Sequence, residues 1–267
     1  MALNEGTEGA GRVADVLLAF MDGPRSQGVS ALARELDLSK AVVHRILKTL
    51  EHRGLLTADA DSRGYHLGPA AAGLGARALR ECDLRAVAMP VLADLRRATA
   101  ETTTVSACVP GGRVYLDQVV SEREIKMTVE VGRRFPLHAG SSGTCILAFL
   151  PPDEQAELLS GPLERLTSTT VVEPRLLERE LERIRSTGFA MSDGQRQQGA
   201  GSVAAPVFGL DGHVEGSISV CGPLDRLDRT TRERFVPLLL DAADRISRAL
   251  GWRGGLPGDQ AAAQVAR

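Results

Sequence analysis

The 267-residue chain has no excess of positive charge and few cysteines. Its 32 Lys and Arg against 34 Asp and Glu give a net charge of -2, so any contact with nucleic acid must come from a local basic patch. The four cysteines, Cys82, Cys108, Cys145 and Cys221, form no C-x-x-C pair and have no histidine at zinc-ligand spacing. We therefore expect four reduced thiols, no metal site and no cofactor.

Long apolar runs are also absent. The first residues, MALNEGTEG, are acidic and lack the apolar region of a signal peptide, and the longest apolar stretches are too short to span a membrane. We therefore expect a cytoplasmic protein with no membrane partner. No internal repeat is visible. The length and the 43% hydrophobic content fit a globular protein of two domains.

Helical periodicity dominates the first fifty residues, where apolar side chains recur at the spacing of one helix face. We predict helices over residues 11–21, 31–36 and 40–53. Ser30 and Ser39 precede the second and third of these, and each is expected to cap the helix that follows it.

Two short strands follow the third predicted helix, which Gly54 is expected to end. The strands are predicted at 55–57 and 64–67, with a polar hairpin tip between them. A helix, a short turn, a second helix and a hairpin follow one another in a winged helix-turn-helix. The N-terminal region is therefore predicted to be a DNA-binding domain.

The third predicted helix would enter the major groove, with its first residues facing base edges. Segment 39–53 carries four basic residues against Glu51 alone, a local charge of +3 that the global charge conceals. A solvated basic helix surface is the alternative interpretation. The candidate DNA contacts are the helix cap, the outer helix face and a basic residue at the hairpin tip: Ser39, Lys40, Val42, His44, Arg45, Lys48 and Arg63.

The second half of the chain predicts an antiparallel sheet with helices packed on it, an α+β domain. Residues 69–80 form a predicted linker helix, and Asp83 is expected to cap a longer helix that Pro90 kinks. The remaining predicted elements are strands at 102–109, 113–120, 125–131, 202–208 and 213–221, and helices at 141–150, 174–187 and 229–250.

Polar residues of this second half point to a small-molecule pocket. Ser219 and Cys221 are two apart on a predicted strand and therefore share one face, and Ser202 lies on the expected partner strand. Ser141 and Ser142 lie where a glycine-flanked loop leads into a helix, whose free backbone N–H groups favour an anion. A carboxylate ligand fits this pattern. The alternative is that Ser141 is only a helix cap and that the strand residues only pack.

The sequence resembles the IclR-type bacterial regulators. Two stretches, LSKAVVHRILKTLEHRGLL and GYHLGP, carry the likeness in the first domain. Three carry it in the second: FPLHAGSSGTCILAFLPPDE, LERELERIRSTGFAMSD and GSVAAPVFGLDGHVEGSISVCGP. Helix-turn-helix motifs alone are common, but the ordered occurrence of the second set is specific. Together the stretches cover most of residues 11–250.

The resemblance implies a GAF-like effector domain, assembly as a homodimer or homotetramer on operator DNA, and a small organic or aromatic acid as effector. It places the ligand against the sheet, between the glycine-flanked loop and the strand pair, with Met127 and Phe135 as apolar walls. Ser192 or Asp193 is expected in the loop after the charged helix. The effector-binding residues are then Met127, Phe135, Ser141, Ser142, Asp193, Ser202, Ser219 and Cys221.

The resemblance also assigns the domains and the function. The chain is expected to be a transcriptional regulator, a repressor controlled by its effector, and not an enzyme. The expected boundaries are 11–68 for the all-α winged helix-turn-helix domain, 69–82 for the linker helix, 83–252 for the effector-binding domain and 253–267 for a disordered tail. Two departures bear on the ligand: Asp193-Gly194-Gln195 stands where relatives commonly carry consecutive acidic residues, and Thr144 stands where they often carry lysine.

Two other functions compete with this interpretation. His138 near Ser141 and Ser142 resembles a hydrolase base and nucleophile, but the segment is one residue shorter than the G-x-S-x-G elbow of such enzymes. Cys145 or Cys221 would serve a thiol redox sensor, yet no basic neighbour in sequence lowers either pKa. An esterase assay and a thiol titration discriminate these alternatives.

Overall fold

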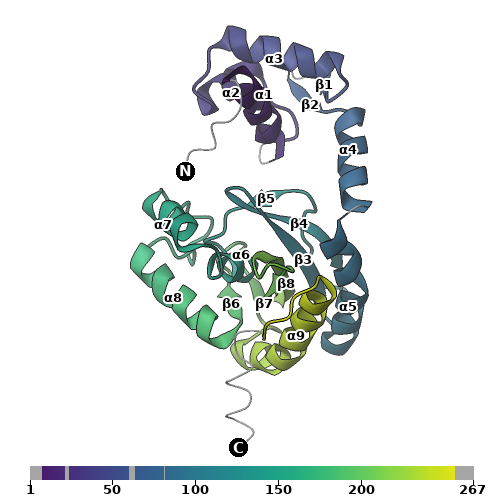
Figure 1. The fold of residues 1–267 in the computed structure, drawn as a ribbon, viewed down its shortest axis with the longest axis vertical. Helices are drawn as coiled ribbons and strands as arrows, with labels where there is room; N and C mark the ends of the chain where they lie inside the picture. The colour runs from purple at the N-terminus through teal and green to yellow at the C-terminus, as the bar shows by residue number, and fades with distance from the viewer. Residues whose placement is uncertain (1–7, 22–23, 60–63, 81, 256–267) are drawn as a thin grey trace, which may run out of the picture. The chain divides into compact units, whose positions relative to one another are not determined.

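The computed structural model describes residues 8–21, 24–59, 64–80 and 82–255. The chain divides into two compact units, residues 1–81 and 82–267, which are considered one at a time (Figure 1). Among the described residues, no helix is both long enough and apolar enough to cross a membrane.

The first unit consists of helices followed by a two-stranded hairpin, the order that the sequence predicts (Figure 1). Its apolar core is formed mainly by side chains of the helices, among them Val16, Leu32, Val43 and Leu47, each fully buried. The elements are α1 (Glu8–Leu18), the 3-10 turn η1 (Ala19–Met21), α2 (Val29–Glu35), α3 (Lys40–His52), β1 (Leu56–Ala58) and β2 (Tyr65–Leu67).

Local chemistry sets the ends of α3. The Ser39 hydroxyl accepts a hydrogen bond from the backbone N–H of Val42 at 3.3 Å, the expected N-cap. Gly54, with φ +69°, follows the helix in the left-handed conformation that favours glycine. The expectation for Ser30 is wrong: α2 begins two residues before the predicted start, at Val29, so that Ser30 lies within the helix and Gly28 is the N-cap.

The hairpin is fixed to the helices through Gln27. Leu56 pairs with Leu67 and Ala58 with Tyr65 across the hairpin. The backbone groups of Gln27 exchange two hydrogen bonds of 2.9 Å with those of Tyr65, and the Gln27 side-chain amide donates to the carbonyl of Ala19. A third backbone segment therefore continues the small sheet and ties it to the end of α1.

Two helices follow the hairpin. Helix α4 (Pro69–Arg80) has the predicted bounds, with proline in its first turn. Helix α5 (Asp83–Thr99) contains Pro90, and Asp83 is its first residue and not its cap, because Cys82 occupies the N-cap position.

The second unit is built on one six-stranded antiparallel sheet with the order β5-β4-β3-β8-β7-β6. All the strand pairs are antiparallel, as the predicted α+β class requires. The strands are β3 (Thr102–Val109), β4 (Gly112–Val119), β5 (Arg134–Phe135), β6 (Ala190–Asp193), β7 (Ala200–Phe208) and β8 (Val214–Pro223).

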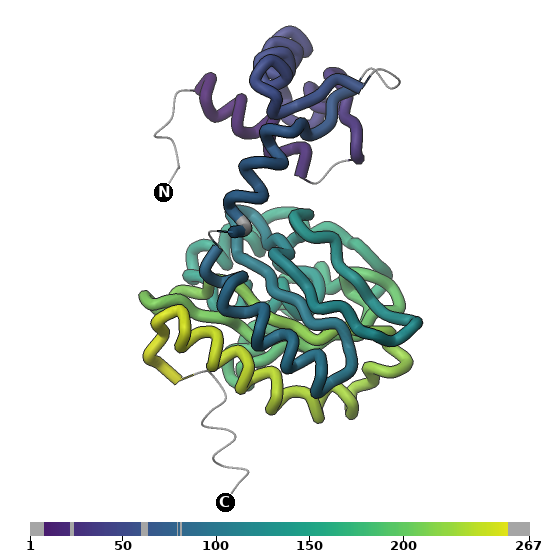
Figure 2. The backbone as a smooth tube through the Cα atoms, turned by 90° about the vertical axis from the view of Figure 1, so that its right-hand side faces the viewer, coloured from purple at the N-terminus to yellow at the C-terminus, as the bar shows by residue number. Residues whose placement is uncertain are grey.

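Helices cover both faces of the sheet (Figures 1 and 2). Helix α5 and helix α9 (Arg229–Ala249) lie side by side on one face, where α5 contacts β3 and β4 and α9 contacts β7. Helix α6 (Ser141–Leu147) packs on β6, β7 and β8, and helix α8 (Pro174–Thr187) packs against α6. Helix α7 (Pro152–Ser160) lies between these two helices in the sequence. Because both faces are covered, many polar residues of the strands are buried, among them Thr104, Ser106 and Ser219.

Three sequence predictions differ from the second unit. Residues 125–131 do not form a strand. The backbone groups of Val129 pair with a side chain and not with a neighbouring strand: the Gln118 amide donates to the Val129 carbonyl and accepts from the Val129 N–H. Ser192 and Asp193, one of which was expected in a loop, both lie on β6. Helix α7, which begins at Pro152, lies between the helices predicted at 141–150 and 174–187 and is not among the predicted elements.

Candidate DNA-binding surface and effector cavity

The outer face of α3 is basic and solvent-exposed. Lys40, His44, Arg45 and Lys48 are all exposed, while the apolar stripe of the same helix is buried in the domain core. This separation leaves the cationic groups of the helix available for a partner. A row of cations on the second helix of a helix-turn-helix suits the phosphates and base edges of a DNA groove.

The cations of α3 differ in whether an ion pair already neutralises their charge. Lys48 forms an ion pair of 2.8 Å with Glu51, and this hydrogen bond is the main reason why the pKa of Lys48 is raised. Its charge is therefore partly neutralised in the free protein. Lys40 and Arg45 have no ion-pair partner among the described residues. Their full charge is available to DNA.

The remaining candidates for DNA contact have other positions. Val42 is half-buried and packs against the domain core, so only part of its side chain faces outward. Ser39 is exposed, but its hydroxyl serves the helix cap. Arg63 lies outside the described residues.

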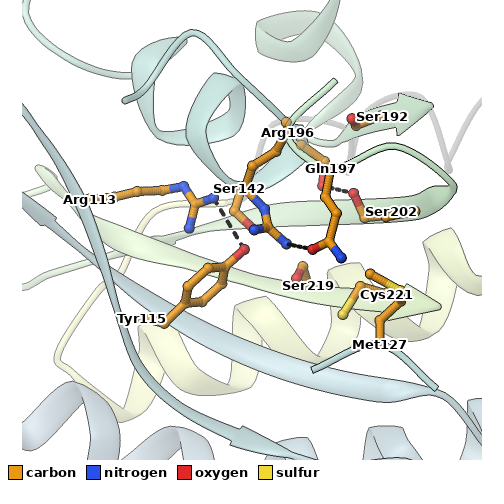
Figure 3. A pocket seen from close by; sticks show the side chains of 13 residues that line it. Arg113, Tyr115, Met127, Ser142, Ser192, Arg196, Gln197, Ser202, Ser219 and Cys221 are labelled. Carbon is orange, nitrogen blue, oxygen red and sulfur yellow. Dashed lines mark hydrogen bonds between the residues drawn. The ribbon is translucent and has the colours of Figure 1, made fainter. Parts of the chain in front are cut away.

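A cavity of about 30 Å³ opens in the second unit, between the sheet and the start of α6 (Figure 3). It gathers short segments that are far apart in the sequence: β4, β6, β7, β8, the first turn of α6 and the turn 194–199. We call it the serine–arginine cavity after its lining residues, which are Arg113, Tyr115, Met127, Gly140, Ser141, Ser142, Ser192, Arg196, Gln197, Ala200, Ser202, Ser219 and Cys221.

Serine hydroxyls from separate elements meet at this cavity. The Oγ atoms of Ser141 on α6 and Ser202 on β7 lie 2.7 Å apart, and the Ser219 Oγ on β8 lies 2.7 Å from the Thr104 Oγ1 on β3. Ser202 on β7 lies directly opposite Cys221 on β8, so the two side chains are neighbours on the same face of the sheet. The structure therefore brings together Ser141, Ser142, Ser202, Ser219 and Cys221, as the sequence predicts.

Arg113 is the most unusual residue of the cavity, because its guanidinium is only 1% exposed and has no carboxylate partner among the described residues. It donates to the Ser106 Oγ at 3.0 Å and to the Tyr115 hydroxyl at 3.1 Å, and its Nε has no hydrogen-bond partner. Burial lowers the pKa of Arg113, and the charge of Arg196 lowers it further. A buried cation without a counter-charge is costly, and a bound anion would offset that cost.

Arg196 brings a second cation to the same place. It belongs to the turn between β6 and β7, and its side chain extends between Arg113 and Tyr115 on one side and Ser202 and Ser219 on the other (Figure 3). Gly140 next to it has φ +82°, and a side chain there would come within 3.2 Å of the Arg196 Cβ. Glycine at this position therefore lets the turn approach the start of α6 closely.

Two predicted effector contacts do not lie on the cavity wall. Phe135 does not line the cavity but packs edge-on to Tyr115, with ring centroids 5.6 Å apart, and its ring also lies near the two cavity arginines. Asp193 is exposed and forms an ion pair with Arg232 of α9, while its neighbour Ser192 lines the cavity. Met127 lines the cavity as predicted, and the hydroxyl of Thr102 anchors its carbonyl at 2.7 Å.

The geometry gives little support to the two competing functions. The His138 Nε2 lies 2.8 Å from the carbonyl oxygen of Glu164, while the Ser141 hydroxyl is engaged with Ser202. The ring nitrogen and the hydroxyl therefore each have another partner. Burial raises the pKa of Cys221 to about 12 and raises that of Cys145 as well, which keeps both sulfurs as unreactive thiols.

Sequence reasoning missed Arg113, Tyr115 and Arg196. Arg113 and Tyr115 are two apart on β4 and so share a face, but the spacing alone does not mark that face as part of a cavity. Nothing in the sequence shows which face of a doubly covered strand turns toward a cavity. Arg196 lies in a turn whose approach to α6 depends on the fold.

A helix-turn-helix domain with an exposed basic helix, joined to an α+β domain that encloses a polar cavity, defines the class of ligand-responsive transcriptional regulators. Two family models match the chain. The IclR helix-turn-helix domain matches residues 9–60, and the bacterial transcriptional regulator IclR C-terminal domain matches residues 76–248. The chain belongs to the IclR family of transcriptional regulators.

Known members resemble the chain over most of its length. It is 30% identical over 230 residues to the HTH-type transcriptional repressor AllR of Klebsiella pneumoniae, which covers 85% of this chain and 84% of that protein. A putative IclR transcriptional regulator from Silicibacter sp. TM1040 matches with a TM-score of 0.82, at 28% identity, over 94% of this chain and 98% of that one.

One matching structure contains a small molecule. An IclR homologue from Microbacterium hydrocarbonoxydans, solved in complex with 4-hydroxybenzoate, matches with a TM-score of 0.69 at 28% identity. The match covers 91% of this chain and 99% of that one. Ligand binding therefore occurs within this family fold.

Proposed function

We propose that this protein is a repressor whose binding to operator DNA is controlled by a small carboxylic acid held in the serine–arginine cavity. The observation that carries the proposal is Arg113, a cation 1% exposed for which the described residues supply no counter-charge. A bound carboxylate would supply that charge and accept hydrogen bonds from the guanidinium. The 4-hydroxybenzoate of the Microbacterium relative is itself a carboxylate, and the Klebsiella relative is named a repressor.

In the proposed complex, the hydroxyls of Ser141, Ser202 and Ser219 bind the other polar groups of the acid, and Met127 contacts its carbon skeleton. Ser142 at the start of α6 contributes its backbone amide. Phe135 and Asp193 act indirectly in this arrangement, through Tyr115 and through Arg232.

On the DNA side, Lys40 and Arg45 are the proposed contacts to base edges, with Val42 and His44 beside them and Ser39 at the helix start. Lys48 and Arg63 are proposed to bind phosphates. We propose that a homodimer or homotetramer presents two such helices to a two-fold symmetric operator.

The test begins with the operator. The full-length protein selects duplexes from a random library, and fluorescence anisotropy then measures the affinity of the selected duplex with and without each member of a panel of aromatic and aliphatic acids. An acid at a hundred times its Kd should also stabilise the protein by about 2.7 kcal/mol. An acid that raises the Tm and weakens operator binding supports the proposal. A protein that binds the operator with the same affinity in every acid contradicts it.

Matched variants locate the site. Ser219→Ala should weaken the response to the acid about two- to tenfold, because it loses a hydrogen bond to a polar group of the acid. Ser142→Leu should abolish the response by filling the cavity. Ser247→Ala is the control, since Ser247 is equally buried but belongs to α9 and binds the backbone of Phe208. Wild-type responses in both cavity variants would place the acid elsewhere.

A further inference from the structure

Two guanidinium groups share one small space in the serine–arginine cavity. The Arg113 Cζ lies 4.4 Å from the centroid of the Tyr115 ring and 5.4 Å from that of Phe135. The Arg196 Cζ lies 5.7 Å and 5.0 Å from the same two centroids. With distances of 4.4 and 5.7 Å to one ring, the two guanidinium carbons are no more than about 10 Å apart.

The acidic side chains near this space are committed elsewhere. Glu101 is held by Arg226 in two hydrogen bonds, of 2.8 and 3.1 Å, and by Arg123 at 3.5 Å. Asp193 is paired with Arg232. Among the described residues, therefore, no carboxylate neutralises either cavity arginine.

The two arginines are held differently. Arg113 lies within the sheet on β4 and is buried, whereas Arg196 is half-buried in a turn. The base of that turn is fixed by Thr167, whose hydroxyl donates to the carbonyl of Gly194 at 2.8 Å, and by Thr170, whose hydroxyl donates to the carbonyl of Gln195 at 2.6 Å. The polypeptide before Arg196 is thus anchored, and its side chain reaches into the cavity from a fixed point.

We infer that the effector is a small dianion, a short dicarboxylic acid whose two acid groups are bound by Arg113 and Arg196. This inference rests on the proposed function, because it assigns the ligand of the same cavity. A monoanion would leave one of two neighbouring cations without a counter-charge, whereas a dianion neutralises both. Two guanidinium carbons no more than about 10 Å apart suit two acid groups on a short skeleton, and the serine hydroxyls beside them suit hydroxyl or keto groups on it (Figure 3).

The test compares succinate and glutarate with their half-amides, succinamate and glutaramate, which have nearly the same size and one charge less. Isothermal titration of the full-length protein measures the Kd of each. We expect each diacid to bind about tenfold or more tightly than its half-amide, because the half-amide forfeits a charge-assisted hydrogen bond. Arg196→Gln should remove this preference by weakening diacid binding and leaving half-amide binding unchanged.

Arg133→Gln is the matched control. The Arg133 guanidinium also lies over the Phe135 ring, at 5.1 Å, but Arg133 pairs with Glu130 and does not line the cavity. It should keep the preference for the diacid. If diacid and half-amide bind equally, and Arg113→Lys weakens both, the effector is not a dianion. The proposal of a carboxylic acid bound by Arg113 is then still supported. A diacid preference that survives in Arg196→Gln overturns the role of Arg196. If neither these compounds nor any acid of the wider panel binds, both proposals fall.

Discussion

At the residue scale, two buried arginines of the same domain show opposite chemistry. Arg232 is 2% exposed, forms an ion pair with Asp193 and donates to the carbonyl of Ser192 at 3.0 Å. Arg113 is as deeply buried and is bound only by neutral hydroxyls and aromatic rings. The first arginine holds β6 and α9 together, while the second carries a charge that no carboxylate of the described residues neutralises.

This contrast predicts opposite effects of the same substitution. Arg232→Met should lower the free energy of unfolding by about 1–3 kcal/mol, since it leaves the buried carbonyl of Ser192 without its donor, while the exposed Asp193 carboxylate is solvated by water. Arg113→Met should raise it by about 1 kcal/mol or more in the absence of acid, because it removes an uncompensated buried charge. It should also eliminate the stabilisation by acids. Urea titration of both variants, with and without succinate, measures these effects. An acid-free Arg113→Met protein as unstable as Arg232→Met would assign Arg113 a purely structural role.

A second prediction at this scale concerns the Cys221 thiol. Because burial raises its pKa to about 12, the sulfur stays protonated at pH 7 to 9 in the folded protein, and only the thiolate is alkylated. Iodoacetamide at pH 8 should therefore leave Cys221 unmodified in the native protein and modify it in urea, as peptide mass spectrometry measures. Cys82, which is partly exposed, is the internal control. Rapid native labelling of Cys221 would show that the cavity opens to solvent.

At the element scale, the cations of α3 differ in how available they are to DNA. Lys40 and Arg45 are exposed and have no ion pair among the described residues, whereas Lys48 is partly neutralised by Glu51. Arg45→Ala and Lys40→Ala should each weaken operator binding by about 1–3 kcal/mol and relax sequence preference if they bind base edges. Lys48→Ala should weaken binding to all sequences alike and lower the salt slope by about one unit.

Anisotropy titrations at several salt concentrations separate these effects. Arg175→Ala is the control, because it removes an equal charge from an exposed position on α8 in the other domain. Thermal unfolding should be unchanged in all four variants. Operator affinity at the wild-type level in Lys40→Ala, Arg45→Ala and Lys48→Ala together would show that another surface binds DNA.

Elements with strong local signals could be predicted from the sequence, and short ones could not. Helices α4 and α8 have the predicted bounds because proline begins each of them and a periodic run follows. Strands β5 and β6 have two and four residues, too few for a period to appear. The segment near Val129 alternates like a strand, yet a side-chain amide and not a backbone pairs with it.

The candidate site divides in the same way. The serines could be predicted because a glycine-flanked loop and a two-residue strand spacing mark them locally, and Ser141 and Ser202 do meet at 2.7 Å. Arg113 and Arg196 could not, because their roles depend on the burial of β4 and on the approach of the 194–199 turn. Tertiary packing, which no local pattern encodes, supplies the charge of the cavity.

At the scale of the whole molecule, charge constrains how the protein meets DNA. The chain carries a net charge of -2, so long-range attraction to DNA is weak and the basic face of α3 must supply it locally. One recognition helix and one short hairpin offer few contacts for operator-grade affinity. Two copies of the protein make twice as many contacts to DNA, and they bind an operator with two half-sites more tightly than a single half-site.

We therefore predict a homodimer or homotetramer in solution and an operator with two-fold pseudo-symmetry. Half-sites read from one side of the duplex should lie about 34 Å apart, or a multiple of that, because the major groove returns to the same side once per helical turn. Light scattering of the free protein at micromolar concentration gives its mass, and hydroxyl-radical footprinting on the selected duplex gives the spacing. Inserting five base pairs between the half-sites should sharply reduce affinity, and inserting ten should restore much of it. A monomer that protects a single half-site would contradict the prediction.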